Sequence, residues 1–266
     1  MQRIVREPEM EVAKAEASTA PPDAMPLSAA TPLPDATALP AATPLPDATA
    51  TEQNLAAWDA LYAQGPRWSR YPPEELSGFI AQTFPDAGRR TAPGALEIGC
   101  GPGANLWFLA REGFAIAGID GSAVAIARAQ ERLAAEGFGG AADLRIGNFA
   151  CLPWPAACFD VVVDIQSISH NTTPVIEAVF AEIHRVLKPG GWFFGRMFGD
   201  RTTGILSGER IDARTTRAVR FGPLTGCGIV HGFSRAELEG LLLDYVHRRI
   251  GESCDIDEWI VQAQKP

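Results

Sequence analysis

The chain has 266 residues, 46% of them apolar and 21% charged, which is the composition of a globular protein with room for one large domain. Its formal net charge of −9 argues against a general nucleic-acid surface and against a patch for anionic membranes, so we expect neither partner. The five cysteines and four histidines show no metal-ligand spacing, and we expect no metal. No stretch approaches the roughly 20 apolar residues that span a bilayer, and no apolar signal-peptide core is present. We therefore expect a soluble protein of the reducing cytoplasm.

Residues 1–50 differ from the rest of the chain because they are rich in alanine, proline and threonine. The sequence Ala-Thr-Pro-Leu-Pro-Asp-Ala-Thr-Ala occurs twice there, at 30–38 and at 42–50. A proline-rich repeat this short cannot bury a core, so we predict a disordered tail. A single domain is then expected over residues 51–266.

From residue 51 the pattern becomes helical and aromatic. Apolar residues recur at helical spacing, and we predict helices over 52–64 and 73–83 that form a lid within residues 51–90. The lid is expected either to cover a small molecule or simply to pack on the sheet. Its aromatic residues are Trp58, Tyr62, Trp68 and Tyr71.

The remaining sequence alternates strands and helices, which predicts a parallel, doubly wound sheet with helices on both faces. The expected strands are 94–98, 115–119, 142–146, 159–165 and 191–198, and the expected helices are 104–112, 122–136 and 174–187. After them we predict an insertion of strand and loop at 200–232, a helix at 235–244, and a closing hairpin of strands 246–253 and 257–264. The fold class is therefore α/β, with a Rossmann-like, mainly parallel seven-stranded sheet and an antiparallel C-terminal hairpin.

A glycine-rich turn follows the first of these strands, with the sequence Glu97-Ile-Gly-Cys-Gly-Pro-Gly103. Glycine lets backbone N–H groups approach a ligand, because no Cβ blocks the way. The turn also satisfies the dinucleotide-binding pattern, so by itself it does not identify the ligand.

Polar residues follow the other strands at the same edge of the sheet, where ligands bind in open α/β folds. Asp120 ends the second strand, and its carboxylate suits the two hydroxyls of a ribose. Asn148 and Phe149 follow the third strand, where an amide and an aromatic ring suit the edge and face of adenine. The fourth strand ends at Asp164 and Ile165, beside the glycine turn. Together these groups suit a nucleoside.

These segments together resemble the class I S-adenosylmethionine-dependent methyltransferases. Further resemblance lies in Phe159-Asp-Val-Val-Val163 of the fourth strand and in His184-Arg-Val-Leu-Lys-Pro-Gly-Gly191 before the fifth. The resemblance covers roughly residues 52–264 and implies S-adenosylmethionine as cofactor. It assigns cofactor binding to Glu97, Gly99, Cys100, Gly101, Gly103, Asp120, Gly121, Ser122, Asn148, Phe149, Asp164 and Ile165.

The charge of Glu97 agrees with this resemblance. A carboxylate beside the glycine turn would repel a pyrophosphate, whereas it would attract an ammonium group. S-adenosylmethionine carries an ammonium group and no phosphate. The alternative, a solvated charge at the end of a strand, assigns Glu97 no role.

The resemblance implies in-line methyl transfer to a nucleophile, for which a general base is needed if the acceptor is a hydroxyl or a protonated amine. His170 follows the fourth strand and is the candidate base; alternatively it caps the helix that begins near Pro174 or only shapes the pocket. His231 is expected either to line the acceptor pocket or to serve the structure. The candidate acceptor-pocket residues are Trp58, Tyr62, Tyr71, Arg196 and His231.

We favour the first of three hypotheses and keep the other two as alternatives. The first is a methyltransferase for a small-molecule acceptor whose nucleophilic atom is O, N, S or C. The second is a non-catalytic module that binds the nucleoside, and the third is an enzyme of the same fold with other chemistry, such as cyclisation. No Asn/Asp-Pro-Pro-Tyr/Phe run follows the fourth strand, which speaks against a nucleobase as acceptor.

Overall fold

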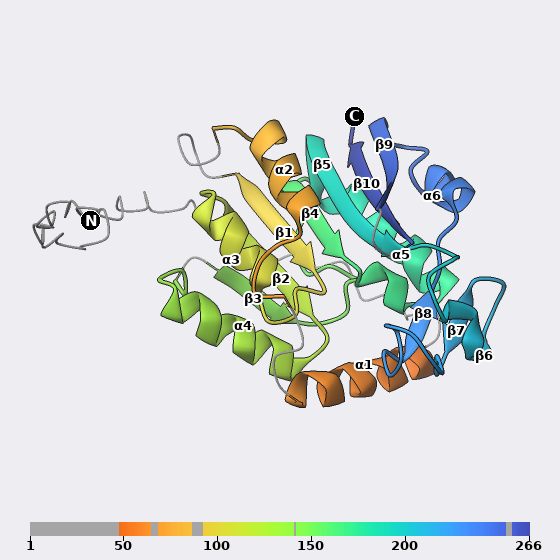
Figure 1. Cartoon of the computed structure of the whole chain (residues 1–266). Helices are drawn as coiled ribbons and strands as arrows, with labels where there is room; N and C mark the ends of the chain where they lie inside the picture. The colour runs from red at the N-terminus through yellow and green to blue at the C-terminus, as the bar shows by residue number, and fades with distance from the viewer. Residues whose placement is uncertain (1–47, 65–68, 87–92, 141, 254–256) are drawn as a thin grey trace, which may run out of the picture.

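The computed structural model describes residues 48–64, 69–86, 93–140, 142–253 and 257–266 (Figure 1). The predicted tail, except residues 48–50, and Trp68 lie outside the described residues. No helix within the described ranges is long and apolar enough to cross a membrane.

The core is a seven-stranded sheet in the order β3-β2-β1-β4-β5-β10-β9. The first five strands in this order are parallel, and β10 and β9 are antiparallel to their neighbours. This arrangement confirms the predicted fold class. The strands are β1 (Gly94–Ile98), β2 (Ala115–Asp120), β3 (Ala142–Ile146), β4 (Phe159–Ile165), β5 (Leu187–Phe198), β9 (Val246–Ser253) and β10 (Glu258–Gln264).

Helices cover both faces of the sheet, and each face has its own apolar core. On one face α2 (Glu74–Thr83), α3 (Ala104–Arg111) and α4 (Ala123–Ala135) pack against the strands. On the other face α5 (Thr173–Val186) and α6 (Arg235–Leu241) bury their apolar sides. The central strand β4 is almost fully buried, as expected for a strand covered on both faces.

The lid helix α1 (Ala48–Ala63) lies apart from these layers, across the carboxyl ends of the strands (Figure 1). It begins four residues earlier than predicted, so the prediction that residues 48–50 belong to the tail is wrong. The second copy of the repeat therefore ends inside a helix, because its last residues, Ala-Thr-Ala, follow the last proline and carry no helix breaker.

Residues 200–232 form the predicted insertion of strand and loop. A small antiparallel sheet in the order β6-β7-β8 is built from β6 (Glu209–Arg210), β7 (Thr215–Arg217) and β8 (Ile229–His231). Two short 3₁₀ helices flank it, η2 (Ile168–His170) and η3 (Ile205–Ser207). Figure 1 shows β8 beside one end of α1.

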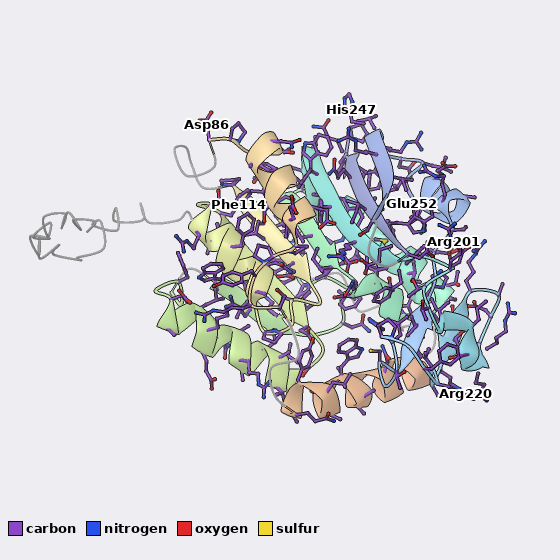
Figure 2. All side chains as sticks on the ribbon, in the orientation of Figure 1. Asp86, Phe114, Arg201, Arg220, His247 and Glu252 are labelled. Atoms are coloured by element: carbon purple, nitrogen blue, oxygen red, sulfur yellow. The ribbon has the colours of Figure 1, made fainter. Side chains whose placement is uncertain are left out.

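Two other element ends differ from the sequence prediction. Strand β5 starts at Leu187 instead of 191, because Leu187 pairs with Phe159 before the register shifts. Helix α6 stops at Leu241 instead of 244, because the backbone N–H groups of Leu243 and Tyr245 bond to carbonyls only three residues back. His247 lies exposed at the start of β9 (Figure 2).

Candidate active site

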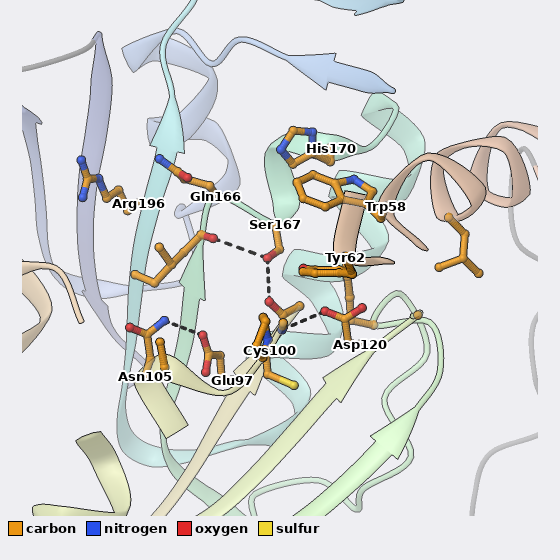
Figure 3. A pocket seen from close by; sticks show the side chains of 18 of the residues that line it. Trp58, Tyr62, Glu97, Cys100, Asn105, Asp120, Gln166, Ser167, His170 and Arg196 are labelled. Carbon is orange, nitrogen blue, oxygen red and sulfur yellow. Dashed lines mark hydrogen bonds between the residues drawn. The ribbon is translucent and has the colours of Figure 1, made fainter. Parts of the chain in front are cut away.

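A cavity of about 740 Å³ lies beyond the carboxyl ends of the parallel strands, in the size range of small-molecule sites (Figure 3). Its wall is made by α1, by residues 69–73, and by the turns that follow β1, β2, β3 and β4. The cavity brings together most of the predicted site residues, namely Glu97, Gly99, Cys100, Gly101, Asp120, Gly121, Asn148, Phe149, Ile165, Trp58, Tyr62, Tyr71, His170 and Arg196.

The glycine turn sits against both the lid and the turn after β4. Gly99 and Gly101 have φ angles of 61° and 50°, in the left-handed region that favours glycine. A Cβ at position 101 would lie 3.1 Å from the Tyr62 hydroxyl oxygen, and a Cβ at 99 would overlap Ser167. The turn therefore needs glycine both for its conformation and for these close approaches.

Glu97 presents a buried carboxylate to this cavity. Asn105 donates from Nδ2 to Glu97 Oε1 at 2.6 Å, whereas Oε2 is buried and has no hydrogen-bond partner among the described residues. Burial raises the pKa of Glu97 to about 8. An unpaired carboxylate oxygen at the end of β1 is the group that an ammonium ligand would satisfy. The site thus fits the amino group of S-adenosylmethionine.

Asp120 is held in a fixed orientation at the end of β2. Its Oδ2 accepts from the Gly101 N–H and its Oδ1 from the Ser122 N–H, both at 2.9 Å. Each oxygen keeps a further lone pair, so the carboxylate can still accept hydroxyl groups. This geometry suits a ribose, as predicted for Asp120.

Asn148 and Phe149 lie on the cavity wall after β3. The Ala150 N–H donates to Asn148 Oδ1 at 2.8 Å, which orients the side chain. The amide NH₂ is then the part of Asn148 that can donate to a ring nitrogen of a base. The structure thus brings both residues to the cavity wall.

Three residues predicted to bind the cofactor do not line the cavity. Gly103 begins α3, where a Cβ would come within 3.1 Å of Ala129 on α4. Ser122 caps α4 by accepting from the Ala125 N–H at 3.1 Å and also bonds Asp59 of α1. Asp164 is fully buried, and its Oδ1 accepts from two backbone N–H groups of the turn after β4, at Ser167 and Ile168. The Ser122 and Asp164 side chains and the Gly103 backbone shape the turns and the helix starts, and none of the three residues lines the cavity.

His170 lies in η2 with its ring on the cavity wall. Its Nδ1 lies 3.0 Å from the carbonyl oxygen of Ile229 in β8. Since a carbonyl only accepts, Nδ1 carries the proton and Nε2 keeps a lone pair. Burial lowers the pKa of His170 to about 4, so the ring is neutral at neutral pH. His170 does not cap α5, whose first turn follows Thr172.

His231 does not line the cavity, so the prediction of a pocket role is wrong and the alternative of a structural role holds. His231 is fully buried in β8, with Nδ1 2.9 Å from Thr215 Oγ1 and Nε2 3.0 Å from Glu237 Oε1. These bonds tie β8 to β7 and to α6. The residue serves the structure of the insertion.

Aromatic side chains of α1 cover the cavity above these groups. The Trp58 ring meets His170 edge-on with 4.6 Å between ring centroids, and Tyr62 lies 5.8 Å from Trp58 (Figure 3). Tyr71 also lines the cavity, although its side chain is largely exposed. The arginines of the insertion lie elsewhere, for example Arg201, which pairs with Asp257 at 2.9 Å on the surface (Figure 2).

Sequence reasoning missed a residue that holds the lid in place. Asn54 donates from Nδ2 to the His170 carbonyl at 2.6 Å and accepts at Oδ1 from the Ile229 N–H at 2.9 Å. Asn54 therefore joins α1 to η2 and β8. Its spacing was a usable signal, because 54, 58 and 62 fall on one face of a helix. Asn105 and Gln166 were also missed, and both line the cavity.

Comparisons with known proteins agree with this geometry. Residues 95–191 match a family model described as a methyltransferase domain. A sterol 24-C-methyltransferase of Yarrowia lipolytica is 36% identical over 99 residues, which are 37% of this chain and 26% of that protein. The chain thus matches only about a quarter of the length of this curated relative.

Solved structures share the fold. A S-adenosylmethionine-dependent methyltransferase from Methanosarcina mazei is 26% identical, with a TM-score of 0.56 over 65% of this chain and 92% of that one. The 1,6-didemethyltoxoflavin N1-methyltransferase of Burkholderia thailandensis, solved with S-adenosylhomocysteine, has a TM-score of 0.60 at 17% identity over 86% and 94% of the two chains. The chain therefore contains a methyltransferase domain of the class I family, whose cofactor is S-adenosylmethionine.

Proposed function

We propose that this chain transfers a methyl group from S-adenosylmethionine to a small-molecule acceptor. The observation that carries the proposal is a cavity with the buried Glu97 carboxylate on one side, whose Oε2 has no hydrogen-bond partner among the described residues, and the neutral His170 ring on the other. The sterol and didemethyltoxoflavin enzymes act, by their names, on small molecules, which supports an acceptor of this class. We assign the domain to residues 51–266 together with the helical residues 48–50.

The cofactor side of the cavity would bind S-adenosylmethionine and orient its methyl group. Glu97 would pair with the amino group of the methionine moiety, Asp120 would accept hydrogen bonds from the ribose hydroxyls, and Asn148 and Phe149 would hold the adenine. Gly99, Gly101 and Gly121 keep the backbone close to the ligand. The sulfonium supplies an already activated methyl group, so alignment and exclusion of water are the main tasks of the protein.

The acceptor side removes the proton that the acceptor loses on methylation. Transfer of the methyl group to the nucleophilic atom of the acceptor would release S-adenosylhomocysteine and leave the acceptor with a proton to lose. The acceptor's proton then passes to His170 Nε2, whose lone pair the bond from Nδ1 to Ile229 leaves in place. Trp58 and Tyr62 cover this region and limit the entry of water.

Two measurements test the proposal in sequence. Calorimetric titration with S-adenosylmethionine and S-adenosylhomocysteine should show binding of both, and binding of neither would contradict the assignment of the cavity. Incubation with labelled S-adenosylmethionine and a metabolite extract should then label a small molecule. Tight binding without any labelled product would favour a non-catalytic binding module.

A further inference from the structure

We propose that Gln166 recognises the methyl acceptor, with its amide oxygen accepting a hydrogen bond from a hydroxyl or N–H group of that molecule. The inference rests on the proposed function and narrows its acceptor class. It excludes acceptors, such as plain hydrocarbons, that have no hydrogen-bond donor.

The backbone of Gln166 has an uncommon conformation. Its φ angle is 68°, in the left-handed region that side-chain-bearing residues seldom adopt. The Gln166 N–H donates to the Arg196 carbonyl of β5 at 2.7 Å, which holds the turn in this form. Backbone strain of this kind, kept at the wall of a ligand cavity, points to a functional constraint on position 166.

The amide of Gln166 is held through its nitrogen, and not through its oxygen, by the described residues. Its Nε2 donates to Oε1 of Glu258, the buried first residue of β10. Arg196 donates from Nε to the other oxygen, Oε2, at 2.6 Å. Because the carboxylate of this ion pair only accepts, Gln166 must turn its NH₂ group toward it. The amide oxygen is thereby left for another partner.

The cavity wall thus offers two hydrogen-bond acceptors to whatever binds there. Gln166 and Arg196 lie on the β5 side of the cavity, and His170 lies next to Trp58 on the other side (Figure 3). His170 contributes the Nε2 lone pair and Gln166 contributes Oε1. A molecule that fills this space must donate to them or leave polar groups unpaired, and sites built in this way reject analogues that lack the donor by factors of about 10⁴.

Arg196 does not add an anion site to this wall. Its guanidinium is engaged by Glu258 and lies 3.9 Å from Glu75 of α2, so two carboxylates surround one cation. The role of Arg196 is to fix Glu258, and through it the orientation of Gln166. The recognised group is therefore a neutral or cationic X–H donor.

The test begins with the acceptor class. Labelled S-adenosylmethionine is offered with three separate panels: phenols and alcohols, primary and secondary amines, and squalene as a hydrocarbon without O–H or N–H. We expect transfer to at least one of the first two panels and none to squalene. Transfer to squalene at a comparable rate, or to none of the panels by a protein that binds S-adenosylhomocysteine, would overturn the inference.

The second arm uses Gln166→Met, which keeps the side-chain length and removes the amide. For the best acceptor of the screen we expect KM to rise at least tenfold, with S-adenosylhomocysteine affinity within twofold of the parent. Calorimetry in the presence of S-adenosylhomocysteine should show that the parent prefers this acceptor to its methylated product, and that the variant has lost this preference.

Two controls separate recognition from damage to the fold. Gln130→Met changes the same residue type at an exposed position on α4, away from the cavity, and should leave KM unchanged. Glu258→Gln frees the orientation of the Gln166 amide and should raise KM by an intermediate factor. If Gln166→Met and Gln130→Met have the same KM, the inference is wrong. If the unsubstituted protein does not bind S-adenosylhomocysteine, the proposed function is wrong, and this inference with it.

Discussion

The two sides of the cavity are assembled from the chain in different ways. On the cofactor side, Glu97 is bonded by Asn105 eight residues away, and Asp120 by Gly101 nineteen residues away. On the acceptor side, Asn54 is bonded to residues 116 and 175 positions away. The cofactor side is thus one strand–turn–helix unit with its neighbour, whereas the acceptor side exists only when lid, η2 and insertion meet.

This difference predicts how the two sides respond to change. Substitutions on the cofactor side should alter affinity for S-adenosylmethionine and S-adenosylhomocysteine. Substitutions on the acceptor side should alter turnover or lid docking and leave cofactor affinity largely intact. A substitution on one side that changed both cofactor affinity and turnover to a similar extent would contradict this division.

The largest effect is expected from His170→Ala. If Nε2 takes the acceptor's proton, its removal should lower kcat by about 10²–10⁴-fold, the usual contribution of a general base. Affinity for S-adenosylhomocysteine should change by no more than a few-fold. His247→Ala, at an exposed position, serves as the control. Equal losses in turnover and binding would show that His170 only shapes the pocket.

The next effect is a pH dependence of cofactor binding that arises from Glu97. With its pKa at about 8, Glu97 is mainly protonated in the free protein at neutral pH. An ammonium partner favours the carboxylate, so binding must release a proton. Affinity should therefore rise with pH, by up to about tenfold per unit, between about pH 6 and pH 7.5.

Calorimetry in buffers of different ionisation enthalpy measures this proton release directly. Glu97→Gln removes the titrating group and should flatten the profile. A profile that stays steep in this variant would assign the proton to another group, of which Asp164 is the nearest candidate because burial raises its pKa to about 8 as well.

Asp120→Ala should weaken S-adenosylmethionine binding by more than tenfold. The substitution removes charge-assisted bonds to the ribose and also frees the Gly101 and Ser122 N–H groups that orient the turn. Asp120→Asn keeps the shape and should have a smaller effect. Unchanged affinity in the alanine variant would mean that the ribose lies elsewhere.

The contrast between the sides also explains what the sequence predicts well. Strand order, the glycine turn and the positions of Glu97 and Asp120 follow from local patterns and from the rule that ligands bind at the carboxyl ends of parallel strands. Within this region, three residues predicted to bind the cofactor are correctly placed along the chain but do not face the cavity. Asp164, Ser122 and Gly103 stand at the expected edge of the sheet. The Asp164 and Ser122 side chains bond turn and cap backbone, and Gly103 lets α3 begin close to α4.

Long-range contacts could not be read from the sequence in the same way. No sequence pattern around Asn54 predicts its bond to Ile229. Likewise, no pattern predicts the left-handed backbone of Gln166, which only the structure shows. His231 shows the opposite error, since a histidine at a helix entrance suggested a pocket and proved to be a buried link to Glu237. Such pairings depend on how the insertion folds back onto the lid.

The smallest effect is expected from the lid contact itself, in Asn54→Ala. The variant loses one bond to His170 and one to Ile229, each of which contributes about 1 kcal/mol. We expect the free energy of unfolding to fall by about 1–2 kcal/mol, with hydrogen exchange accelerated at the Ile229 N–H. Asn54→Asp keeps the acceptor for the Ile229 N–H but not the donor to His170, so it should retain protection at Ile229 while turnover declines. The two bonds lost in this variant join the lid to η2 and β8, whereas the described lid residues that contact the cofactor side include Leu55, Asp59 and Tyr62. Cofactor affinity should therefore fall by a few-fold at most. A drop as large as that of Asp120→Ala would mean that the lid, and not the strand ends, holds the cofactor.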